Sequence, residues 1–213
     1  MPIIADVADE QQVQEMVLKV HARWGHLDIL VNNAGLMLLG PIEGADTEDW
    51  RRMVNVNLLG LMYATHAALP LMKAQREGHI VNISSVAGRT VAAGRAVYNA
   101  TKWAVGAFSE ALRQEVHMHH IRVTVIEPGA VATELTEHIT NPAARQEAQQ
   151  WYHSMHILRS EDIAAAIVYA VTQPAYVNVN EILIRPAEQD RQLASNAAYA
   201  FPPAWKRRFW SVD

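Results

Sequence analysis

The chain has 213 residues, of which half are hydrophobic and 19% are charged, and its formal net charge is −4. This length and composition suit one globular domain with a substantial core, while the charge argues against a nucleic-acid-binding protein and the absence of cysteine excludes a disulfide framework and thiol catalysis. The first residues lack the basic segment and apolar run of a signal peptide, and no apolar stretch reaches the ~18 residues of a membrane helix, so we expect a soluble cytoplasmic protein.

Short apolar runs alternate with longer helical patterns along the chain. We expect helices at 10–24, 47–75, 96–118 and 160–172, and strands at 27–33, 79–84, 121–127 and 181–185, with 3–6 as the remnant of an earlier strand. This alternation predicts a parallel sheet covered by helices on both faces, that is, a doubly wound α/β fold with three layers.

One predicted strand ends in a pair of serines. The run 80–83 is short, apolar and rich in β-branched residues, which indicates a buried strand with Ser84 and Ser85 at its carboxyl end. Ligands bind at that edge of open α/β sheets, so a hydroxyl there is placed to meet a substrate oxygen. Taken alone, the same residues are explained by a polar exit from a strand.

A tyrosine and a lysine stand four residues apart in the following predicted helix. Tyr98 and Lys102 would then share a helix face, with the ammonium beside the phenol. A free tyrosine titrates near ~10, and a neighbouring cation lowers that pKa, so the pair suits a general acid/base acting on an alcohol or a carbonyl. Taken alone, this spacing is more typical of an ordinary helix surface.

Together with further motifs, this pair resembles the short-chain dehydrogenases/reductases. The matching residues are Asn32-Asn33-Ala34-Gly35, Asn57, Ser85, Tyr98-x-x-x-Lys102 and Glu127-Pro128-Gly129, in the order and spacing of the family. The similarity covers a catalytic domain at 1–186. It implies a Rossmann-like sheet, NAD or NADP as cofactor with NADP slightly preferred, and hydride transfer between that cofactor and an alcohol or carbonyl substrate.

The resemblance implies a role for each matching position. Tyr98 is expected to be the acid/base, Lys102 to lower its pKa and bind the nicotinamide ribose, and Ser85 to orient the substrate oxygen. Asn57 is expected to hold a water that links Lys102 to solvent, or else to bond the backbone as an amide inside a helix; Asn32 is expected to tie strands together. The expected cofactor contacts are Asp6, Val7, Asn33, Ala34, Gly35, Tyr98, Lys102, Pro128, Gly129, Val131 and Thr133.

The glycine-rich turn that normally opens a dinucleotide-binding fold is not found before Asn32. We therefore expect a fragment that begins inside the family's third strand, with Asp6 and Val7 facing the adenine and two strand-helix units, on the order of 50 residues, missing. This expectation predicts an unpaired apolar edge on the strand 27–33, lowered stability and a tendency to aggregate. It also predicts weak or absent binding of nicotinamide cofactor by the chain alone.

Two functions stay open. The first is a nicotinamide-dependent oxidoreductase, and the second is a non-catalytic, truncated protein that survives through helix-mediated dimerisation. The helices that carry Asn57 and Tyr98 resemble the subunit interface of the family, which implies a homodimer or homotetramer. No metal site is expected, because His117, His119 and His120 suit a solvated helix end.

The substrate is weakly constrained. Arg89 and Arg95 lie between Ser85 and Tyr98; one of them can meet a carboxylate, although an exposed loop arginine is the preferred interpretation. The stretch 134–156 resembles the mobile substrate lid of the family. Segments 36–41 and 181–186 resemble bacterial members that act on small hydroxy acids or on aldehydes of antibiotic biosynthesis. The tail 187–213 is expected to be disordered or to contact a subunit.

Overall fold

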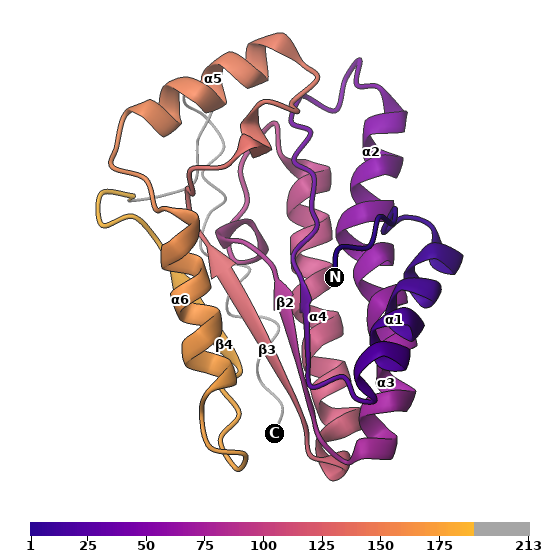
Figure 1. The fold of residues 1–213 in the computed structure, drawn as a ribbon. Helices are drawn as coiled ribbons and strands as arrows, with labels where there is room; N and C mark the ends of the chain where they lie inside the picture. Colours follow the sequence, from indigo (N-terminus) through magenta and orange to yellow (C-terminus); the bar gives the residue numbers. More distant parts are fainter. Residues whose placement is uncertain (190–213) are drawn as a thin grey trace, which may run out of the picture.

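A four-stranded parallel sheet lies between helices in the computed structural model, which describes residues 1–189 (Figure 1). The strands are β1 (Ile29–Asn32), β2 (Gly78–Ile83), β3 (Ile121–Pro128) and β4 (Glu181–Ile184), in that spatial order. In the register, Asn32 lies beside Asn82, and Ile83 beside Ile126. Because all four strands run in the same direction, their carboxyl ends meet at one edge of the sheet, and this confirms the predicted doubly wound α/β fold.

The helices follow the strands in alternation. They are α1 (Glu10–Trp24), α2 (Thr47–Val54), α3 (Leu61–Gln75), α4 (Ala96–Val116), α5 (Pro142–His153) and α6 (Ser160–Val171), with a π-helical segment η1 (Asn55–Gly60) and 3₁₀ turns η2 (Val86–Gly88), η3 (His117–His119) and η4 (Glu134–Thr136). The bounds of α1 agree with the sequence because both ends carry a cap. Asp9 accepts a hydrogen bond from the Gln12 amide, and Gly25 ends the helix in the left-handed region.

Neighbouring residues of β2 serve opposite faces of the sheet. Ile80 packs in a core cluster with α1, α3, α4 and β3, whereas Val81 packs in a second cluster with Ile163 of α6. Successive side chains of a strand point to opposite faces, so both faces need apolar residues and a helical cover. Figure 1 shows the resulting three layers, with α3 and α4 on one side of the sheet and α6 on the other.

The structure differs from the sequence prediction in three places. Residues 3–6 are not a strand, because the described chain provides no neighbouring strand with which they pair. The helix expected at 47–75 is helical throughout but contains the π-helical segment η1, a type of irregularity that occurs mostly at functional sites. Helix α5 was not predicted as a helix; Asn141 caps it by accepting a hydrogen bond from the Ala144 amide, and Pro142 opens its first turn.

The edge strand β1 has no partner on its outer side among residues 1–189. Its Ile29 and Val31 side chains are 44% and 40% exposed, so the expected apolar edge is present. Most of the tail expected at 187–213 lies outside the described residues. Within the described part of the chain, no helix combines the length and the apolar character needed to span a membrane.

Candidate active site

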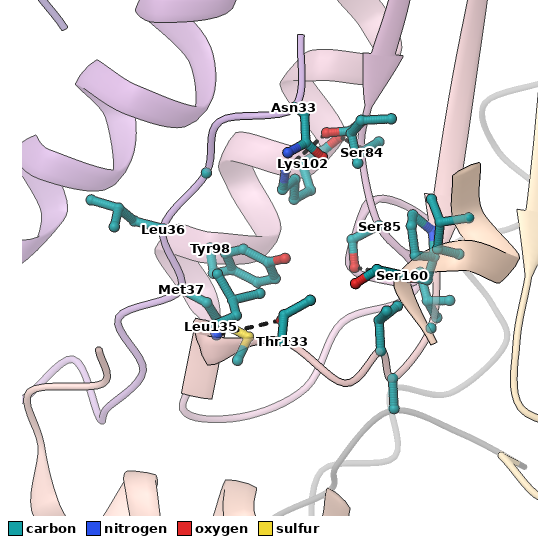
Figure 2. Close-up of a pocket in the computed structure, with 18 of the residues that line it drawn as sticks. Asn33, Leu36, Met37, Ser84, Ser85, Tyr98, Lys102, Thr133, Leu135 and Ser160 are labelled. Atoms are coloured by element: carbon teal, nitrogen blue, oxygen red, sulfur yellow. Dashed lines mark hydrogen bonds between the residues drawn. The ribbon is translucent and has the colours of Figure 1, made fainter. Parts of the chain in front are cut away.

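A cavity of about 500 Å³ opens at the carboxyl ends of β1, β2 and β3. It is lined by most of the residues that the sequence singled out, although they are up to 100 positions apart in the chain (Figure 2). These are Asn33, Ala34, Gly35, Ser85, Tyr98, Lys102, Pro128, Gly129, Val131 and Thr133. The parallel topology therefore brings together three loops and the first turns of α4.

Tyr98 and Lys102 lie on one face of α4, as their spacing predicted. The Lys102 ammonium nitrogen is 5.9 Å from the centre of the Tyr98 ring, and both side chains are buried. Figure 2 shows the Tyr98 hydroxyl pointing into the space near Lys102 and Ser85. Lys102 Nζ donates to the Ile83 carbonyl oxygen at 2.9 Å and has no second acceptor within the described chain. An ammonium has three donors, so its capacity to bind a ligand is largely unused.

Ser85 is held at the end of β2 by its own backbone contacts and by α4. Its hydroxyl oxygen accepts a hydrogen bond from the Ala87 amide at 3.1 Å and donates to the Pro128 carbonyl oxygen at 3.4 Å. Asn99 of α4 donates to the carbonyl oxygens of Ala87 and Thr90, which fixes η2 and the residues after it. The Ser85 side chain is therefore preorganised beside the cavity.

Gly88 allows η2 to pack directly on α4. A Cβ atom at this position would lie 2.8 Å from the Lys102 carbonyl oxygen and 2.8 Å from Ser84 Oγ, which is too close for any side chain. Ser84 in turn donates to the same Lys102 carbonyl oxygen at 3.0 Å. The turn that carries Ser85 and the helix that carries Lys102 are thus held in contact through backbone atoms.

Asn57 lies beneath the cavity and does not line it. Its Oδ1 accepts from the Leu36 amide at 2.7 Å, and its Nδ2 donates to the Leu36 carbonyl oxygen and to Thr101 Oγ1. This is the backbone-bonding arrangement that the sequence offered as one of two interpretations. The fully buried amide ties the loop after β1 to α4, and so it positions Gly35 against Lys102.

The sequence of the chain matches the family model described as "short chain dehydrogenase" over residues 1–144. The chain belongs to the short-chain dehydrogenase family. A related oxidoreductase from Staphylococcus saprophyticus is 41% identical over 186 residues, which cover 86% of this chain and 75% of the relative.

Solved structures of short-chain dehydrogenase relatives agree. The serine dehydrogenase from Escherichia coli is 38% identical, with a TM-score of 0.73 over 88% of this chain and 76% of that chain. A closed form of serine dehydrogenase complexed with NADP⁺ is 39% identical, with a TM-score of 0.83 over 91% of this chain and 78% of that chain. At 38% and 39% identity, these two structures support membership of the family as well as the shared fold.

Burial dominates the electrostatics of this short-chain dehydrogenase site. It lowers the pKa of Lys102 to about 8 and raises the pKa of Tyr98, an effect that the Ser85 hydroxyl and the Arg95 charge oppose. The sequence predicted that the pKa of Tyr98 would be lowered, and this prediction is wrong for the described residues. The reason is that desolvation of the phenol outweighs the neighbouring charges, and Lys102 is itself a weakened cation.

The nicotinamide end of the cofactor fits the residues present. A Cβ atom at Gly35 would lie 3.4 Å from Asn57 Oδ1 and 3.8 Å from Lys102 Nζ, so the glycine keeps open the space in front of the ammonium. Lys102 has spare donors for ribose hydroxyls. The expected adenine contacts lie elsewhere: Asp6 accepts from the Ala8 amide, and Val7 packs on Gly60 of η1. Neither residue lines the cavity, and their role stays a prediction.

Several residues of the site had no individual role in the sequence prediction, although some lie in the predicted lid. Trp151 and Tyr152 of α5 line the cavity, as do Met37, Leu135 and Ser160. The lid-like stretch was noted, but α5 has no motif that shows which of its side chains face inward. Gln189 was assigned to the tail, yet it is buried and its Oε1 accepts from the Ala130 amide at 2.9 Å. Asn99 gave no signal other than its position beside Tyr98.

The two arginines of the loop before α4 differ. Arg89 pairs with Glu127 at 2.7 Å and with Glu181, so it links the end of β2 to β3 and β4. Arg95 is only 7% exposed and lines the cavity. The preferred interpretation of both as exposed loop arginines is therefore wrong for Arg95, because α5 packs over the start of α4 and buries it.

Proposed function

We propose that this chain is an NAD(P)-dependent oxidoreductase that transfers a hydride between a nicotinamide cofactor and an alcohol or carbonyl substrate, with Tyr98 as general acid/base. The observation that carries the proposal is the convergence of Ser85, Tyr98 and Lys102 in one buried cavity. A relative of solved structure is complexed with NADP⁺, which supports this cofactor class and agrees with a slight preference for NADP.

Each residue contributes a separate part of the reaction. The cofactor, when bound, supplies or accepts the hydride. When substrate binds, the Ser85 hydroxyl turns its proton from the Pro128 carbonyl oxygen to the substrate oxygen, where charge develops. Tyr98 gives that oxygen its proton in reduction or removes it in oxidation. Lys102 binds ribose hydroxyls through its unused donors and stabilises the phenolate. Asn57 ties the loop after β1 to α4 and so keeps Gly35 in place against Lys102. Residues 33–35 with 128–133 enclose the nicotinamide.

The raised pKa of Tyr98 favours the reductive direction near neutral pH. A phenol whose pKa lies above its ordinary value is protonated at pH 7 and is therefore ready to donate to a carbonyl oxygen. Oxidation needs the phenolate and should become faster as the pH rises. Turnover measured in both directions between pH 6 and pH 10 tests this; a reductive rate that increases with pH would contradict it.

Tyr98→Phe is the decisive variant. It keeps the ring that fills the core but removes the hydroxyl, so we expect turnover to fall by at least ~100-fold, the lower range for loss of a general acid. Binding of NADPH, followed by its fluorescence, should stay within a few-fold. Tyr176→Phe, at a side chain that is 90% exposed, is the matched control. Turnover retained in Tyr98→Phe would show that the assignment of the acid/base is wrong.

A second candidate function is that of a non-catalytic protein that self-associates without binding cofactor. The exposed apolar side chains of β1 favour this candidate, since they leave an unsatisfied surface beside the cofactor site. Fluorescence titration of the purified 213-residue chain with NADH and NADPH separates the two, because micromolar binding is incompatible with the non-catalytic reading.

We also propose a homodimer or homotetramer formed through α4 and the helices joined by η1. Trp103 of α4 is 42% exposed and offers an apolar contact for a second copy. Sedimentation equilibrium of the wild type and of Trp103→Glu measures this directly; a monomer in both would contradict it.

A further inference from the structure

Arg95 is a buried cation with unused hydrogen-bonding capacity. It immediately precedes α4 and its side chain makes no hydrogen bond or ion pair with any residue in 1–189. One of its terminal nitrogens, Nη2, is fully enclosed and has no partner in that same range. Buried guanidinium groups are normally paired, because five N–H donors taken out of water without acceptors are strongly unfavourable.

The surroundings of Arg95 hold the guanidinium in place but provide no hydrogen-bond acceptor for its Nη2. Its central carbon lies 5.9 Å from the centre of the Trp151 ring, so the group rests against an aromatic face. Tyr152, Tyr98 and Glu147 influence it electrostatically, but none of them gives Nη2 a hydrogen-bond partner. A ring face attracts a cation but accepts no hydrogen bond along the edge of the guanidinium, and that edge is the part that recognises a carboxylate.

Arg95 and Tyr98 are three residues apart at the start of α4, and both line the same cavity. Residues at this spacing are neighbours on a helix. An anionic group bound at Arg95 therefore lies close to the substrate oxygen that Tyr98 is proposed to protonate. Arg89, six residues earlier, is unsuited to the same task, since Glu127 and Glu181 already occupy its donors.

We propose that Arg95 binds the carboxylate of the substrate, and hence that this oxidoreductase acts on hydroxy acids and the corresponding oxo acids. The proposal rests on the proposed function. In the oxidative direction, the carbinol carbon loses a hydride, with both electrons, to NADP⁺, and the hydroxyl loses its proton to Tyr98. The carboxylate is unchanged and serves only to bind and orient the substrate through two parallel N–H···O contacts.

The test compares charged and uncharged substrates of equal size. We would measure kcat/KM of the full 213-residue protein with NADP⁺ for 2-, 3- and 4-hydroxybutanoate and for the amide of each acid. At least one acid should exceed its amide on the order of 10- to 100-fold, the range for a hydrogen bond to a charged group. Arg95→Gln should bring the ratio of acid to amide near one.

Two further variants define the effect. Arg95→Lys keeps the charge but not the planar pair of donors and should give an intermediate ratio. Arg51→Gln on α2 removes an exposed arginine outside the cavity and should leave the ratio unchanged. Near-UV circular dichroism checks folding; should Arg95→Gln fail to fold, the ratios of the wild type and Arg95→Lys decide, and a wild-type ratio near one overturns the proposal.

A binding measurement separates this proposal from the proposed function. Saturation-transfer NMR of the same acids and amides reports binding without turnover. Preference for an acid that is lost in Arg95→Gln, in a protein that turns over nothing, supports the carboxylate site and contradicts the oxidoreductase. Equal turnover or equal binding of acid and amide, in the wild type and in Arg95→Gln alike, overturns the carboxylate site and leaves the oxidoreductase standing.

Discussion

Buried polar groups that join β1, β2 and α4 differ from those that line the cavity at the carboxyl edge of the sheet. In the first set, Asn32 donates to Asn82, Asn82 donates to Ser109, and Ser109 donates to the Val105 carbonyl oxygen, with distances of 2.8, 2.9 and 2.6 Å. At the edge, Lys102 uses one of its three donors, and the Arg95 side chain makes no hydrogen bond within the described chain. The first network joins β1, β2 and α4 as a structural tie. The second group has spare capacity, which indicates a ligand.

Lys102→Met tests the polar groups at the carboxyl edge of the sheet and should have the largest effect on turnover. Removing the ammonium should lower turnover by ~10³-fold, within the range for loss of proton transfer and its support. The same variant should be more stable than the wild type by about 1–2 kcal/mol at pH 7. The lysine pKa of about 8, against 10.5 when exposed, corresponds to roughly 3 kcal/mol, from which the lost bond to Ile83 is subtracted.

The pH dependence of this gain has a definite sign. Between pH 8 and about 10.5 the native state has released the Lys102 proton while the unfolded chain still binds it, so wild-type stability rises with pH across that window. The advantage of Lys102→Met should shrink at pH 10. Urea unfolding at pH 7 and pH 10 measures it, with Lys19→Met at an exposed lysine as the control. A variant less stable than the wild type at pH 7 would contradict the contrast between edge and interior.

Much of this contrast was predictable from particular residues, and some was not. The order of strands and helices, the facing of Tyr98 and Lys102, and the tie made by Asn32 all depend on local periodicity and motif spacing, which a sequence displays. The state of Arg95 was not predictable. Its burial depends on α5, about 50 residues later, and nothing in the sequence separates it from Arg89, which finds Glu127 and Glu181 as partners.

The buried His79 should make the stability of the protein depend on pH under acidic conditions. Its Nε2 lies 2.7 Å from Thr124 Oγ1, and because the Thr124 hydroxyl donates to Val179, Nε2 carries a proton and donates to Thr124. Burial, and to a smaller extent Arg122, lowers the pKa of His79 to about 4. The unfolded chain binds this proton from pH 6.5 downward, so stability should fall by up to roughly 3 kcal/mol between pH 6.5 and pH 4.

The control for His79 is an exposed histidine. His79→Gln should reduce the loss of stability between pH 6.5 and pH 4, whereas His66→Gln on the surface of α3 should not. Urea unfolding at pH 4, 5, 6 and 7 gives the three curves. Parallel curves for the wild type and His79→Gln would mean that the histidine is accessible to protons in the native state.

Asn82→Ala tests the hydrogen-bonded network of Asn32, Asn82 and Ser109 and should have the smallest effect on turnover. The substitution removes a side chain that is fully buried, takes one acceptor from Asn32 and takes the donor to Ser109, so we expect a loss of about 2 kcal/mol of stability. Turnover per folded molecule should stay within a few-fold, because Asn82 does not line the cavity. A double-mutant cycle with Ser109→Ala should be strongly non-additive, since each single variant already breaks the same hydrogen bond. Additive losses would mean that the two residues act independently, and the complete network would then be no guide to which buried polar groups serve structure and which await a ligand.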